Sequence, residues 1–245
     1  MRNNIIVRSL YVAYQLFIAL PLGLLLTVIT SLCISVGSLF NAHFWGYWPA
    51  HLWSRAICVL LLLPVKVRGR EHLNPKQSYV FVANHQGAMD IFLIYGYLGR
   101  NFKWMMKKSL RKMPFVGIAC EKARHIFVDR SGPKAIEATL IQARDTLKDG
   151  TSLVVFPEGH RTFTGKMNTF KKGAFLLAKD IPLPIVPVTI DGSFDVLPRT
   201  KGLNFVHRHM LKLIIHQPID PSDIEKAMEQ SCKTIEDSLT PQNAS

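Results

Sequence analysis

Two short polar clusters hold the side chains from which acid–base chemistry can be built. The first, at 84–90, is Asn-His-Gln-Gly-Ala-Met-Asp, and the second, at 156–162, is Phe-Pro-Glu-Gly-His-Arg-Thr. His85 is the candidate general base, because imidazole changes its charge near neutral pH. Asp90 would bind the other ring nitrogen, fix the tautomer and stabilise the imidazolium. Such a pair can take the proton from a hydroxyl group as that hydroxyl attacks an acyl carbon.

The second cluster adds groups that bind anions. Arg161 is the first candidate for a phosphate anchor, because a guanidinium can bind phosphate through two parallel hydrogen bonds. Glu158 can bind a hydroxyl of the substrate or position Arg161, and Gly159 can let the backbone approach a ligand. A structural Glu–Arg pair in a turn is the alternative. Taken with His85, these residues suit acyl transfer to a hydroxyl of a phosphorylated substrate.

Each cluster directly follows a short apolar run typical of a buried strand, at 79–83 and at 152–155. Loops that follow strands are where α/β folds place their chemistry. On a regular helix, residues five apart point about 140° away from each other. His85 and Asp90 can therefore meet only if His85 lies in the turn before a helix and Asp90 lies in its first turn.

The residues after 64 alternate between strand-like and helical patterns, which predicts an α/β fold with a mixed, largely parallel sheet flanked by helices over 65–245. For the helices, Pro133 suits the first turn of 133–148 and Gly150 its end, while Ser222 and Glu225 predict a capping box for 222–239. The expected strands are 65–69, 78–83, 124–128, 152–156, 185–190 and 210–215.

The N-terminal part, 1–64, is expected to anchor the chain in a membrane. No Asp, Glu, Lys or Arg occurs between Arg8 and Arg55, and the apolar stretch at 10–40 exceeds the roughly 20 residues that a spanning helix needs. Pro21 and Gly23 interrupt the stretch, so a single kinked helix and a helical hairpin are both compatible with it. Tryptophans gather just after it, as in an aromatic belt at a lipid–water interface.

The charge balance favours an anionic partner. Lys and Arg number 30 against 17 Asp and Glu, a formal net charge of +13. An anionic membrane surface or a phosphorylated substrate is a better match than nucleic acid, because the cations are not interleaved with aromatic residues in a recognised module. The four cysteines are far apart, which suits reduced thiols. The histidines show no metal-ligand spacing, and no metal or tightly bound cofactor is expected.

The pattern NHxxxxD followed by FPEGxR resembles the signature of the glycerolipid acyltransferases. The segments 107–117, 125–130 and 185–190 resemble further conserved blocks of that family, in its order and spacing. The similarity covers roughly 65–215. The chain departs from the commonest pattern at three positions, Gly87 where Ser or Asn is frequent, His160 where Thr is usual and Thr162 where Ser is usual.

The resemblance implies transfer of a fatty acyl chain from acyl-CoA or acyl carrier protein, as co-substrate, to the sn-2 hydroxyl of lysophosphatidic acid, giving phosphatidic acid. Arg130 would be a second anion contact and Lys107 or Lys108 a third, although the cations of 100–112 can also face anionic lipid headgroups. Supporting positions in the conserved blocks are Asn84, Phe156, Pro157 and Pro187.

Two alternatives to this activity stay open. One is the same reaction on another lysophospholipid or an amino-acid lysolipid, and His160 is the first position expected to determine such a difference in acceptor. The other is a non-catalytic protein that binds anionic lipids. The expected location is a bacterial inner membrane, with the catalytic part on the cytoplasmic side, and membrane lipids as partners.

Overall fold

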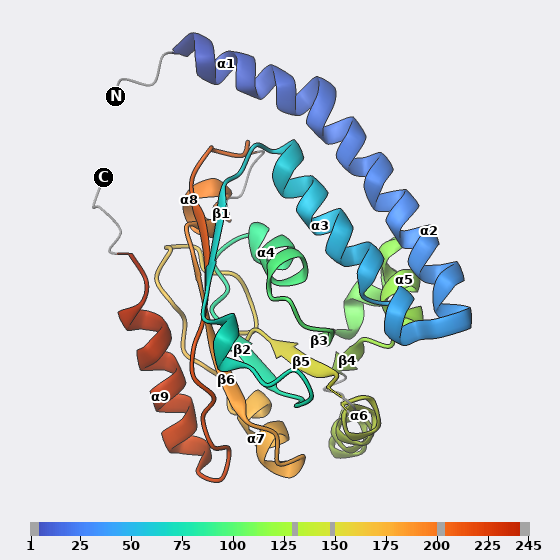
Figure 1. Cartoon of the computed structure of the whole chain (residues 1–245), viewed down its shortest axis with the longest axis vertical. Helices are drawn as coiled ribbons and strands as arrows, with labels where there is room; N and C mark the ends of the chain where they lie inside the picture. The colour runs from blue at the N-terminus through green and yellow to red at the C-terminus, as the bar shows by residue number, and fades with distance from the viewer. Residues whose placement is uncertain (1–4, 129–131, 148–149, 200–203, 241–245) are drawn as a thin grey trace.

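In the computed structural model, one mixed sheet is covered by helices on both faces (Figure 1). The structure describes residues 5–128, 132–147, 150–199 and 204–240, and Arg130 lies outside these ranges. Among the described residues, seven strands follow the order β1-β7-β6-β2-β5-β3-β4. They are β1 (Val65–Arg68), β2 (Val80–Ala83), β3 (Phe102–Lys107), β4 (Ile126–Val128), β5 (Ser152–Val155), β6 (Ile185–Asp191) and β7 (Leu211–Ile215).

All neighbouring strands pair in parallel except β6 and β7, which are antiparallel. This arrangement confirms the mixed, largely parallel sheet. Among the longer helices are α3 (Trp48–Leu60), α4 (Met89–Tyr97), α5 (Val116–Lys122), α6 (Pro133–Thr146), α7 (Gly173–Asp180) and α9 (Ile224–Asp237). The short elements are α8 (Ser193–Val196) and the 3-10 turns η2 (Arg70–His72) and η3 (Lys108–Lys112).

Strand β2 shows how the sheet separates two cores. All four of its residues are buried, as in strands covered on both faces. Phe81 and Ala83 pack on the face that carries α3 and α4, whereas Val80 and Val82 pack on the face that carries α6, α7 and α9. This is the period of two expected for side chains along a strand. The central strand that leads into the first polar cluster is therefore packed on both of its faces.

Strand β3 was missed in the sequence because its cations look solvated. Lys103 is only 3% exposed, and its ammonium lies 3.5 Å from the carbonyl of Ala42. Burial, with a smaller effect of Arg124, lowers the pKa of Lys103 to about 8. The expectation that the cations of 100–112 face lipid headgroups is therefore wrong for this residue.

Of the two predicted helix starts, one is confirmed and the other is wrong. Pro133 stands in the first turn of α6 as expected. The capping box at the start of α9 is wrong by one residue, because the carboxylate of Asp223 accepts the N–H groups of Glu225 and Lys226. Ser222 instead bonds to Asp220 through its own N–H and hydroxyl. The negative charge of a carboxylate is also favoured at the positive end of the helix dipole.

The N-terminal region is one kinked helix that arches over the α3–α4 face (Figure 1). It runs through α1 (Ile5–Tyr14), a π-helical stretch η1 (Gln15–Ala19) and α2 (Leu20–Trp45), whose backbone leaves the helical conformation at Asn41, with φ −151° and ψ 93°. The π-turn lies just before Pro21, which has no N–H to donate. Of the helices in the described residues, this one is long and apolar enough to cross a membrane. The chain reverses after α2, and α3 packs between α2 and α4.

Candidate functional site

The two polar clusters meet at one edge of the sheet. They follow β2 and β5, which are parallel neighbours, so both clusters leave the sheet at its carboxyl edge. The side chain of Asn84, fully buried, closes this edge toward β6. Its amide donates to the carbonyl of Ile190 at 2.8 Å and accepts the N–H of Ile190 at 2.7 Å. Asn84 thus fixes the end of β2 against the next strand.

His85 and Asp90 form the contact that their spacing required. His85 lies in the turn before α4 and Asp90 in its first turn, with 2.7 Å between Nδ1 and Oδ2. The same Oδ2 accepts the backbone N–H groups of Gln86 at 2.7 Å and Gly87 at 3.0 Å. Because the carboxylate accepts from Nδ1, that nitrogen carries the proton and Nε2 presents its lone pair. The His85 side chain is 16% exposed and that of Asp90 fully buried.

Gly87, one of the departures from the family pattern, has a steric reason. A Cβ at this position would lie 2.5 Å from Oγ and 2.6 Å from the carbonyl oxygen of Ser193. Ser193 begins α8, directly after β6. The backbone oxygen cannot rotate away as a side chain can, so only glycine fits between the first cluster and α8.

A row of aromatic rings supports the imidazole. His85 stacks on Phe156, with ring centroids 3.9 Å apart and planes 8° apart. Phe156 stacks in turn on Trp104, at 5.3 Å and 25°. The backbone N–H of Trp104 donates to Nδ1 of the buried His125. Burial, and to a lesser degree Lys103, lowers the pKa of His125 to about 3, so this histidine is neutral.

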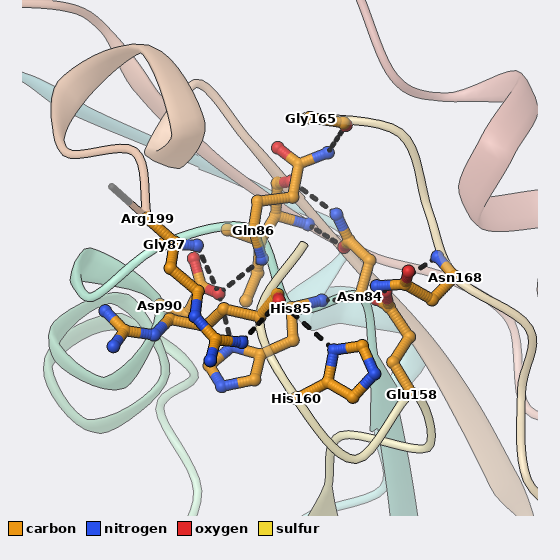
Figure 2. Close-up of polar contacts among 12 residues, drawn as sticks. Asn84, His85, Gln86, Gly87, Asp90, Glu158, His160, Gly165, Asn168 and Arg199 are labelled. Atoms are coloured by element: carbon orange, nitrogen blue, oxygen red, sulfur yellow. Dashed lines mark hydrogen bonds and ion pairs between the residues drawn. The ribbon is translucent and has the colours of Figure 1, made fainter. Parts of the chain in front are cut away.

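Glu158 joins the two clusters rather than pointing into solvent. Figure 2 shows Asp90 on one side of His85 and Glu158 on the other. Oε1 of Glu158 accepts the backbone N–H of His85 at 2.6 Å, and Oε2 accepts both the N–H and the side-chain amide of Asn168 at 2.7 Å each. The side chain is 1% exposed. Burial raises the pKa of Glu158, and these hydrogen bonds oppose that rise.

The backbone around Arg161 is tied to the same loop. The N–H of Thr162 donates to the carbonyl of His85 at 3.0 Å. The carbonyl of Arg161 receives a hydrogen bond from Nη1 of Arg199 at 3.2 Å and contacts Nδ1 of His160 at the same distance (Figure 2). Arg161 itself is half-buried. The structure therefore places the backbone of Arg161 beside the loop that carries the proposed base.

Arg199 was missed in the sequence. It follows α8, and its guanidinium carbon lies 3.9 Å from the centroid of the Phe163 ring. This cation–π contact and the bond to the Arg161 carbonyl hold a second guanidinium next to the second cluster. The only sequence signal was a cation shortly after the 185–190 block, which is too weak to single it out.

The remaining predicted residues lie around this edge. Lys107 ends β3, is exposed and leaves the sheet on the same side as the clusters. Gly159 has a φ of +78°, which favours glycine. The carbonyl of Pro157 accepts from Lys171, and Pro187 lies in β6 opposite Val82. No group of three or more metal-ligating side chains occurs among the described residues.

Known proteins resemble this chain in sequence and in fold. A family model described as Acyltransferase matches residues 64–191. A 1-acyl-sn-glycerol-3-phosphate acyltransferase of Saccharomyces cerevisiae is 32% identical over 91% of this chain and 74% of its own length. A chloroplast enzyme of that name from Arabidopsis thaliana is 29% identical over 78% of this chain, which spans about half (53%) of that relative.

A solved structure is similar over nearly its whole length. It is the 1-acyl-sn-glycerophosphate (LPA) acyltransferase PlsC of Thermotoga maritima, with a TM-score of 0.68 and 25% sequence identity. The match covers 90% of this chain and 97% of that one. The likeness therefore extends well beyond the residues that the family model matches.

Proposed function

This chain belongs to the Acyltransferase family, and we propose that it transfers a fatty acyl group from a thioester donor to the sn-2 hydroxyl of lysophosphatidic acid, giving phosphatidic acid. The observation that carries the proposal is the His85–Asp90 pair, 2.7 Å apart, with the backbone of the second cluster bonded to the His85 carbonyl through the N–H of Thr162. The names of the yeast, plant and bacterial relatives support the same acceptor.

In the proposed reaction, Nε2 of His85 takes the proton of the acceptor hydroxyl as its oxygen attacks the thioester carbonyl. The carbon–sulfur bond then breaks, and the departing thiolate takes the proton from the imidazolium. Asp90 stabilises the imidazolium between the two steps. The acyl group passes directly to the acceptor, without a covalent acyl-enzyme.

We assign the acceptor phosphate to Arg161, with Arg199 as a second contact. Phe163 holds the Arg199 guanidinium in place before substrate arrives, which reduces the entropy lost on binding. Arg130 and Lys107 are kept as further anion contacts. Both phosphate-binding arginines lie close to the loop of His85.

Residues 1–64 are proposed to hold the enzyme on the bilayer that contains its acceptor, through the long apolar helix. We place the site on the cytoplasmic face of a bacterial inner membrane, where acyl-CoA or acyl carrier protein supplies the donor. Arg2 and Arg8 near the start of the chain favour a cytoplasmic N-terminus. The proposed placement therefore requires the apolar helix to enter and leave the bilayer on the same face instead of crossing it once.

The first test compares detergent-solubilised wild type with His85→Ala and with Lys179→Ala, an exposed control on α7. Each is supplied with acyl-CoA or acyl carrier protein and lysophosphatidic acid, and phosphatidic acid is measured by mass spectrometry. Product from wild type and the control alone is expected. Equal product from His85→Ala would remove His85 as the base.

The phosphate assignment is tested with a matched acceptor, monoacylglycerol, which lacks the phosphate. Arg161→Gln and Arg199→Gln are expected to raise KM for lysophosphatidic acid by about tenfold or more, the factor that losing one charge-assisted hydrogen bond implies. Turnover of monoacylglycerol should change little. An unchanged preference between the two acceptors would contradict the assignment.

A further inference from the structure

The segment after β3 is exposed and apolar at once. Residues 107–115 are all exposed, and so is Ile118 in α5. We call residues 107–118, with Lys122, the β3–α5 surface. Its large apolar side chains are exposed to a similar degree, with Leu110 at 39%, Met113 at 46%, Phe115 at 53% and Ile118 at 57%. Apolar side chains gathered in this way commonly mark a contact site.

The same surface is strongly basic. Between 107 and 124 the sequence holds six Lys and Arg residues against one acid, Glu121. Arg111 is partly engaged within the fold, 3.5 Å from Glu121 and over the ring of Phe127. Lys112 and Lys122 are exposed. Apolar side chains ringed by cations match the boundary between acyl chains and anionic headgroups.

The backbone at Phe115 is strained in a way that its own packing does not explain. Phe115 has φ +58° and ψ −54°, and the N–H of Val116 donates to the carbonyl of Pro114 at 2.6 Å. This is a γ-turn with positive φ, which is rare for a residue with a side chain. Strain of this kind collects at functional sites. The residue that carries this backbone strain is a phenylalanine that is more than half exposed.

The β3–α5 surface lies beside the C-terminal part of α2. Figure 1 shows α5 beside the C-terminal part of α2, and the two helices are in contact. At the end of α2, a Cβ on Gly46 would lie 3.2 Å from the Cβ of Ala123, just after α5. The neighbouring part of α2 exposes Leu39 at 67% and Phe40 at 84%. A bilayer that receives this part of α2 would therefore also reach α5.

We infer that the β3–α5 surface is a second membrane contact, seated on an anionic lipid bilayer beside α2. Phe115 and Ile118 enter the acyl boundary, and Lys112 and Lys122 lie among the headgroups. If the proposed function is right, this contact also gives the acceptor a short path, because Lys107 begins the surface at the sheet edge that carries His85. The membrane contact itself does not depend on catalysis.

The test uses a photo-crosslinking amino acid, p-benzoylphenylalanine, introduced one position at a time into the full chain. The chain is reconstituted in vesicles of phosphatidylcholine with or without phosphatidylglycerol. Phe115 and Ile118 are the test positions, and Phe40 on α2 is the positive control. Ile141 is the matched control, since it is an isoleucine 52% exposed on α6, across the sheet from α2.

After irradiation, protein joined to lipid is measured by mass spectrometry. Positions 115 and 118 are expected to give several times the lipid adduct of position 141, approaching that of position 40, and more with phosphatidylglycerol. Adduct at 115 and 118 no greater than at 141 would overturn the inference, as would cross-links that join two copies of the chain. Catalytic activity is not needed for this readout, so failure of the proposed reaction would leave it unaffected.

Discussion

Replacing Glu158 by Gln separates two roles that the sequence left open for this residue, binding the substrate and holding the fold. The carboxylate accepts from the His85 backbone on one oxygen and from Asn168 twice on the other. A glutamine has one acceptor oxygen, so its amide nitrogen must face one of these donors. Keeping the two bonds to Asn168 leaves the N–H of His85 against another donor.

The expected loss in the free energy of unfolding follows from those contacts. Losing one charge-assisted hydrogen bond costs about 1.5–3 kcal/mol, and leaving the buried N–H unsatisfied falls in a similar range. Because the two estimates overlap, we expect a loss of about 2–4 kcal/mol in the free energy of unfolding. For a chain of this size, that lowers Tm by roughly 4–16 °C. The displaced His85 backbone should also lower kcat, since a shift of about 1 Å near a reacting group can cost roughly 100-fold.

The assay combines thermal unfolding in detergent with initial rates over a range of lysophosphatidic acid concentrations. A fall in both Tm and kcat, with a smaller change in KM, is expected for Glu158→Gln. Asn168→Ala should lower Tm in the same direction while leaving the bond to His85 in place. A Glu158→Gln variant with wild-type Tm and a raised KM alone would refute this reasoning and return Glu158 to the role of substrate ligand.

Three further substitutions test other parts of the site. Asp90 receives three hydrogen bonds on Oδ2, while its buried Oδ1 has no partner among the described residues. Asp90→Asn can therefore keep the His85 tautomer, but it loses the charge and places the amide NH2 where it finds no acceptor; kcat should fall by roughly 100-fold, and further in Asp90→Ala, as measured by initial rates. His125 is held neutral with a pKa of about 3 against an ordinary 6.5, so the unfolded state binds the proton first as pH falls; between pH 7 and pH 5, thermal unfolding should show wild type losing about 2 kcal/mol more than His125→Asn, which is the contribution of this one group. Gly87→Ser should lower kcat by roughly 100-fold, because the new Cβ would meet the Ser193 backbone. Wild-type rates in Asp90→Asn or Gly87→Ser, or an unchanged pH dependence of unfolding in His125→Asn, would count against these contacts.

The sequence predicted the contact between His85 and Asp90 because local rules were enough. An apolar run, a turn and a helix place His85 and Asp90 within reach, and the parallel strands β2 and β5 bring the second cluster to the same edge. The functional roles of these residues remain predictions. The structure adds the contacts that these residues make. Glu158, for example, accepts a hydrogen bond from the His85 backbone rather than pairing with Arg161.

The parts that could not be predicted depend on contacts distant in sequence. Lys103 is buried in β3, which pairs with β5, and its ammonium lies near the carbonyl of Ala42 at the end of α2; no local pattern reveals these contacts. Arg199 comes beside Arg161 through a cation–π contact with Phe163. Asp223 rather than Ser222 caps α9, a choice of one residue that propensity alone does not decide.

The site is assembled mainly through backbone groups, and this has a consequence for its specificity. Glu158 holds the N–H of His85, Thr162 holds the carbonyl of His85, and Arg199 holds the carbonyl of Arg161. Side chains that take no part in these three backbone contacts can therefore change without moving the His85 ring. His160 is exposed, and its hydrogen-bond contact among the described residues is with the carbonyl of Arg161. A change of acceptor headgroup would then fall to residues such as His160, while the distance between His85 and Asp90 stays fixed.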